Sequence, residues 1–66
     1  MQIILNGDNL DISETLSIEA LLARVGKSPE HVAVECNGQV VEAKEFPKLQ
    51  LKSGDVLEIV HFVGGG

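Results

Sequence analysis

The sequence has little cysteine, few aromatic residues and few cations. Cys36 is the single cysteine among 66 residues, which excludes an internal disulfide and any multi-cysteine zinc or iron–sulfur site within one chain. Five Lys and Arg stand against ten Asp and Glu, and the chain has no Trp, no Tyr and two Phe. Nucleic-acid binding needs cations for phosphates and aromatic rings for bases. That role is disfavoured, and the net charge of −5 favours a basic partner surface instead.

The chain also lacks room for an enclosed active site. Its 66 residues form one small domain, which cannot enclose a deep pocket and keep a core as well. Metal-ligand spacings, phosphate-binding glycine loops and nucleophile motifs are missing from the sequence. We therefore expect a protein that is not an enzyme and binds no cofactor.

The N-terminal segment has no basic region and no long apolar run, so neither a signal peptide nor a membrane span is expected. A chain this small with a single thiol is typical of a reducing compartment, which predicts a cytoplasmic location.

Hydrophobic patterns predict an α+β fold with two hairpins and a long last strand. The first hairpin joins residues 1–6 to 10–12 through a turn at 7–9, with a loop of three or four residues. The second joins 31–36 to 39–42 through Asn37-Gly38. A loop that ends in a short edge strand is predicted for residues 44–51, and the last strand is predicted for residues 56–63.

One helix is expected between the hairpins. Ser17 can cap its start, and Gly26 suits the left-handed residue that follows its end. The apolar residues that repeat at helical spacing are Ile18, Leu21, Leu22 and Val25. Since no other element can cover the sheet, this helix must pack on one of its faces.

The last strand has two apolar faces, and one helix can cover only one of them. Alternation places Leu57 and Ile59 toward the helix. Val60 and Phe62, with Ile4 on a neighbouring strand, then face away and form a predicted docking patch for a partner. The alternative is that the loop around Phe46 folds over them.

The sequence ends in three glycines, Gly64, Gly65 and Gly66. Without side chains, these residues are expected to leave the sheet as a flexible tail, so that 1–63 form the domain and 64–66 the tail. Such a tail can enter a narrow channel in a partner enzyme, where the Gly66 carboxylate can be activated. The alternative is a disordered end with no role.

The thiol and the histidines have structural interpretations. Cys36 shares a strand face with Val32 and Val34, so it is expected to act as a small hydrophobic residue. His31 and His61 have no acidic or cysteine companion at ligand spacing, and both are expected to be structural.

The chain resembles the thiamine-biosynthesis sulfur carrier family, ThiS, over its whole length. The resemblance rests on the Met1-Gln-Ile-Ile-Leu-Asn-Gly7 start, the Ser17-Ile-Glu-Ala-Leu-Leu22 helix and the Val32-Ala-Val-Glu-Cys-Asn-Gly38 hairpin. It rests above all on the ending, Gly54-Asp-Val-Leu-Glu-Ile-Val-His-Phe-Val-Gly-Gly-Gly66. The resemblance implies a ubiquitin-like β-grasp fold, with a mixed sheet of four to five strands and one helix on one face.

The resemblance also implies a carrier cycle in which partners perform the chemistry. An adenylyltransferase of the ubiquitin-activating, ThiF-like type uses MgATP to adenylate the Gly66 carboxylate, while Gly64 and Gly65 lie in its channel. A sulfur donor derived from a cysteine desulfurase then leaves a thiocarboxylate, which gives its sulfur to a ThiG-like thiazole synthase.

Three alternatives stay open on the sequence. The small subunit of molybdopterin synthase is similar in fold, diglycine end and thiocarboxylate chemistry. A ubiquitin-like modifier would form isopeptide bonds with lysines. A plain β-grasp interaction module would not need the tail.

Overall fold

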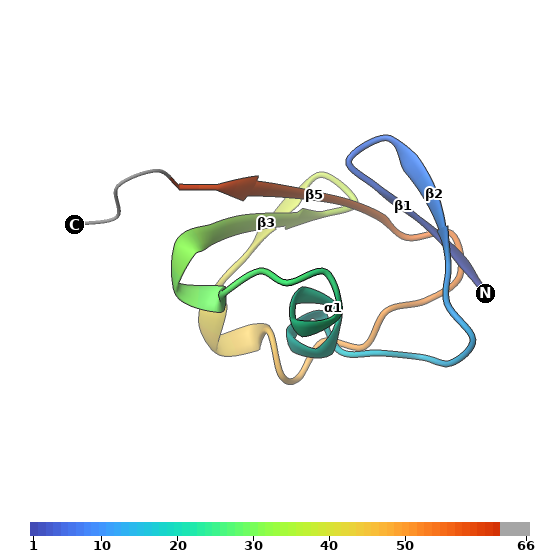
Figure 1. Ribbon diagram of the computed structural model, residues 1–66, viewed down its shortest axis with the longest axis horizontal. Helices are drawn as coiled ribbons and strands as arrows, with labels where there is room; N and C mark the ends of the chain where they lie inside the picture. Colours follow the sequence, from blue (N-terminus) through green and yellow to red (C-terminus); the bar gives the residue numbers. More distant parts are fainter. Residues whose placement is uncertain (63–66) are drawn as a thin grey trace.

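The computed structural model describes residues 1–62, which form one five-stranded sheet with one α-helix on one face (Figure 1). The elements in chain order are β1 (Gln2–Leu5), β2 (Asp8–Asp11), α1 (Ile18–Arg24), η1 (Pro29–His31), β3 (Val32–Cys36), β4 (Gln39–Val41), η2 (Ala43–Glu45) and β5 (Val56–His61), where η1 and η2 are 3₁₀ turns. The strand order across the sheet is β2-β1-β5-β3-β4. The central strand β5 is parallel to β1, and all other neighbours are antiparallel, so the sheet is mixed.

Both hairpins turn on an Asn-Gly pair. Asn37 and Gly38 have φ angles of 54° and 83°, and Asn6 and Gly7 have φ angles of 50° and 84°. Two successive positive φ angles give the turn whose twist matches antiparallel strands. The first hairpin therefore has a two-residue loop, and the predicted turn at 7–9 is wrong. Asp8 and Asn9 lie in β2 and pair with β1.

Helix α1 begins and ends as its sequence predicts. The Ser17 hydroxyl oxygen accepts a hydrogen bond from the Ala20 N–H at 3.0 Å, which caps the start. At the end, Gly26 adopts a φ of 76° and the Lys27 N–H donates to the Leu22 carbonyl at 2.8 Å. Because this left-handed turn satisfies the last carbonyls, the seven-residue helix stops there.

The core lies between the sheet and α1, where the segment from β4 to β5 also passes (Figure 1). Its buried residues are Ile3, Ile12, Ile18, Leu21, Leu22, Val32, Val34, Phe46, Leu51, Leu57 and Ile59. Phe46 is 2% exposed and its carbonyl accepts from the Glu19 N–H, so this loop packs on the helix side. It does not fold over Val60 and Phe62, which excludes that alternative.

Three details qualify the predicted elements. The short edge strand expected before residue 51 is a single bridge between Ser17 and Gln50. Strand β5 ends at His61, and Val63 and the predicted boundary between 1–63 and 64–66 lie outside the described residues. Within residues 1–62, no helix is long and apolar enough to cross a membrane. The α+β class, with a mixed sheet and one helix on one face, is confirmed.

Candidate functional site

Strand β5 leads into the C-terminal glycines, and strand β3 holds it along its full length. The two strands pair from Cys36 opposite Leu57 to Val32 opposite His61. One residue further, the Phe62 N–H donates to the His31 carbonyl at 2.7 Å. The backbone is therefore held by the sheet up to the last described residue, and the glycines begin two residues later.

On the opposite side, β1 pairs with β5 only briefly, and an asparagine side chain extends the pairing. Backbone pairing covers Ile4 with Val56 and Leu5 with Leu57. Beyond it, the Asn6 amide accepts from the Ile59 N–H at 2.8 Å and donates to the Ile59 carbonyl at 3.2 Å. The side chain thus replaces a backbone pair where β1 turns away.

Asn37 makes a related contact at the start of β5. Its side-chain oxygen accepts from the Val56 N–H at 2.9 Å, and its amide nitrogen donates to Asp55 at 3.0 Å. Both turn asparagines therefore position the strand that carries the candidate site. Sequence reasoning missed this role, although the repeated Asn-Gly pair was a visible signal for it.

The face of the sheet away from α1, called the outer face here, carries the predicted docking residues. Val60 is 61% exposed and Phe62 is 48% exposed, while Ile4 is half-buried. Ile4 lies opposite Val56, itself 40% exposed, so the two strands contribute neighbouring apolar side chains. Exposed apolar side chains on adjacent strands are typical of a protein-binding surface. A docking role for Val60, Phe62 and Ile4 stays a prediction.

Two carboxylates interrupt this apolar surface. Glu35 on β3 lies directly opposite Glu58 on β5, and both are exposed on the outer face. Like charges at directly opposite positions destabilise a sheet. A basic residue of a partner placed between them would relieve this repulsion, so the pair is a candidate recognition feature beside the apolar side chains.

Cys36 has the surroundings expected of a small hydrophobic residue, and His31 and His61 are both exposed. Cys36 is half-buried, packs against the core and lies 3.7 Å from the Asn37 amide nitrogen. Burial, and after it the Asp55 carboxylate, raises the pKa of its thiol, so it is a weak nucleophile at neutral pH. The rings of His31 and His61 meet edge to face with centroids 6.2 Å apart.

The candidate features among the described residues are surfaces for recognition, and the candidate reacting group lies beyond them. Among residues 1–62, no group of three or more His, Cys, Asp or Glu side chains could hold a metal ion. The proposed reacting residue Gly66 and the tail residues Gly64 and Gly65 lie outside the described range. What the fold provides is a well-held strand that precedes them and an apolar face beside it.

The topology defines a β-grasp domain with a covered sheet face, exposed apolar side chains on the outer face and a glycine-rich C-terminal sequence. The family model described as "ThiS family" matches residues 3–66, so the chain belongs to the ThiS family.

Similar proteins agree with this assignment. The crystal structure of a ThiS thiamine biosynthesis protein from Geobacter metallireducens superposes with a TM-score of 0.85 at 35% identity, over all of both chains. The sulfur carrier protein ThiS of Bacillus subtilis is 40% identical over 53 residues, which is 80% of each chain. A thiazole synthase of Paramagnetospirillum magneticum is 38% identical over all 66 residues. The chain spans 20% of the length of that synthase.

Proposed function

We propose that this chain is a sulfur carrier of thiamine biosynthesis, whose Gly66 carboxylate becomes a thiocarboxylate. The observation that carries the proposal is the match of the ThiS family model through the three terminal glycines. The sheet supports it, because the strand before the glycines is hydrogen-bonded up to Phe62. In this role the chain is a co-substrate, and its partners perform the catalysis.

The chemistry requires activation because the oxygen of a carboxylate is a poor leaving group. A ThiF-like adenylyltransferase transfers AMP from MgATP to the Gly66 carboxylate and releases pyrophosphate. The terminal sulfur of a persulfide, supplied through a cysteine desulfurase, attacks the acyl carbon and releases AMP. Cleavage of the remaining S–S bond by a thiol leaves the thiocarboxylate. Glycines suit this step, since no Cβ obstructs a narrow channel at Gly64 and Gly65.

Recognition by partners is assigned to the outer face. Val60, Phe62 and Ile4 provide the apolar contact, and the carboxylates of Glu35 and Glu58 favour a basic partner surface. Thiazole synthase is the proposed acceptor of the sulfur. The thiazole synthases that contain a region similar to this whole chain support that partnership.

The direct test is high-resolution mass analysis of the C-terminal peptide after incubation with MgATP, a host adenylyltransferase and a sulfur source. Replacement of one oxygen by sulfur, localised to Gly66, is expected. Localisation separates this change from oxidation of Met1 or Cys36. A variant with one residue added after Gly66 is the matched control and is expected to stay unmodified. An unchanged Gly66 carboxylate in the wild-type chain would refute the proposal, and isopeptide conjugates would indicate a modifier instead.

The outer face is tested separately by Phe62→Asp. Because Phe62 is 48% exposed, the substitution is expected to weaken binding to the adenylyltransferase at least about tenfold while the unfolding midpoint changes little. Phe62→Leu keeps an apolar side chain and is expected to retain most of the affinity. If Phe62→Asp lowers the unfolding midpoint clearly and leaves binding intact, the residue belongs to the core and the assignment is wrong.

A further inference from the structure

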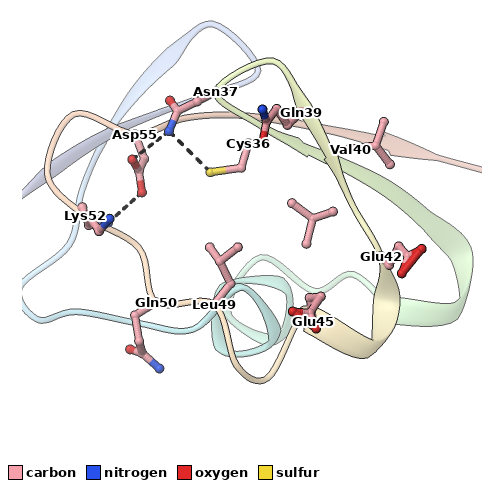
Figure 2. A pocket seen from close by; sticks show the side chains of 11 residues that line it. Cys36, Asn37, Gln39, Val40, Glu42, Glu45, Leu49, Gln50, Lys52 and Asp55 are labelled. Atoms are coloured by element: carbon pink, nitrogen blue, oxygen red, sulfur yellow. Dashed lines mark hydrogen bonds between the residues drawn. The ribbon is translucent and has the colours of Figure 1, made fainter.

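Strand β4 forms one edge of the sheet, and a hollow of about 480 Å³ lies beside it. The hollow separates β4 from the segment that precedes β5 (Figure 2). On the β4 side it is lined by Gln39, Val40, Val41 and Glu42, and on the other by Glu45, Leu49, Gln50 and Lys52. It lies apart from Val60 and Phe62, which do not line it.

The hydrogen-bonding pattern of the sheet leaves the backbone of Val40 directed outward. Asn37 and His31 bond to β5, so by alternation Glu35 also bonds toward β5, while Val34 and Cys36 bond toward β4. Their partners on β4 are Val41 and Gln39. The intervening residue, Val40, therefore directs its N–H and carbonyl away from β3. An edge with such groups is a template for another strand.

The side chains around this edge define what a bound strand would meet. Leu49, Val41 and Cys36 are partly buried and pack on the core, so they provide an apolar floor. On the outer face, Val40 is 74% exposed, the largest exposure among the bulky hydrophobic residues of 1–62. Successive side chains of an added strand point to opposite faces, so one would contact the floor and the next would contact Val40.

The ionic groups of the hollow are unevenly distributed. Near Lys52, the Asp55 carboxylate accepts from the Lys52 backbone N–H at 2.7 Å and from the Asn37 amide (Figure 2). At the other end lie Glu42 and Glu45. Glu42 pairs with Lys44 at 3.4 Å in an exposed contact, while within residues 1–62 no cation lies at ion-pair distance from Glu45. This end therefore favours a cation.

We propose that the β4 edge binds an extended basic segment of a partner protein by strand addition. The segment places an apolar side chain on Leu49, a second apolar side chain beside Val40, and a lysine or arginine near Glu45. The residue opposite Val40 exchanges two backbone hydrogen bonds with it. A second copy of this chain is a poor occupant, because each copy carries a net charge of −5 and the two copies would repel each other.

The test titrates the full chain with a short capped peptide whose central residues, from the N- to the C-terminus, are lysine, valine and leucine, and follows amide NMR shifts. In an antiparallel added strand with the valine opposite Val40, this order places the lysine opposite Val41, toward the end of the hollow where Glu42 and Glu45 lie. The largest shifts are expected at Val40 and its neighbours on β4 and at Leu49. Two N-methylated peptides of identical charge provide the controls. Methylation of the valine removes the bond to the Val40 carbonyl and is expected to lower affinity about tenfold. Methylation of the lysine, whose N–H faces solvent in the added strand, is expected to change affinity less than about threefold.

A protein variant tests the ionic contact without altering the edge. Glu45→Gln is expected to weaken the lysine peptide several-fold, and to have little effect on a peptide with glutamine in place of lysine. Equal losses for the two N-methylated peptides would refute strand addition. Shifts confined to Val60 and Phe62 would place binding on the outer face and also refute it. Concentration-dependent shifts of Val40 without peptide would show that a second copy occupies the edge, contrary to the proposal.

Discussion

The side chain of Asn6 is expected to stabilise the middle of β5, and Asn6→Gly tests this contact. Glycine adopts the φ of 50° found at this position, so the turn is preserved while both bonds to Ile59 are lost. Each such bond contributes about 0.5–1.5 kcal/mol, so the free energy of unfolding should fall by about 1–3 kcal/mol. For a domain of this size, that corresponds to a melting temperature lower by about 5–20 °C.

Hydrogen exchange gives the residue-specific measurement. In Asn6→Gly, the Ile59 N–H faces the side where β1 has turned away, so its protection should fall at least about tenfold more than that of Val60. Val60 bonds toward β3 and keeps its partner. The comparison between adjacent amides removes the global loss of stability from the result.

Asn37→Gly is the matched control, because it removes the same side chain at a φ of 54° in the other Asn-Gly turn. Asn37 accepts from Val56 and makes no bond to Ile59, so this variant should expose the Val56 amide and leave the Ile59-to-Val60 ratio unchanged. Equal ratios in both variants would refute the idea that Asn6 replaces a strand pair.

Three further predictions concern charge, the thiol and the helix end. Glu58→Gln removes the repulsion with Glu35 and should raise the melting temperature by about 2 °C at low salt, with a smaller gain at high salt, measured by calorimetry. The folded pKa of the Cys36 thiol lies above its ordinary value of 9.0, so the unfolding free energy of the wild type relative to Cys36→Ala should be constant at neutral pH and fall as the pH rises beyond about 9. A rise of this free energy above about pH 9 would contradict burial of the thiol. Gly26→Ala, at a φ of 76°, should lower the unfolding free energy by about 1 kcal/mol in denaturant titrations, and no change would contradict the helix-ending turn.

The sequence was most informative where local chemistry decides the structure. The cap at Ser17, the left-handed Gly26 and the second Asn-Gly turn were each predicted from short patterns whose geometry needs no distant partner. The first hairpin was misplaced because Asp8 and Asn9 are also typical turn residues. Strand register decided between the two readings, since Asp8 pairs with Leu5 and leaves Asn6-Gly7 as the loop.

Contacts between residues far apart in the chain could not be predicted from the sequence. The position of Phe46 depends on which side of the sheet the segment from β4 to β5 crosses, and hydrophobicity alone gives both sides equal weight. The bond from Asn6 to Ile59 joins residues 53 positions apart and depends on the short parallel pairing of β1 with β5. The alternation of β5 did predict the exposed side of Val60 and Phe62, because the alternation of side chains along a strand does not depend on which strands pair with it.

The exposed outer face follows from the balance of elements in so small a chain. Helix α1 has seven residues, and with the segment around Phe46 it covers the inner face of the sheet. No described element remains for the outer face, so its side chains contribute little to the core whatever their polarity. The apolar Val60 and Phe62 are therefore not explained by folding, and the opposed Glu35 and Glu58 act against it. Stability alone would favour polar side chains of alternating charge on this face. The apolar and like-charged side chains found there are instead the composition expected for binding a partner.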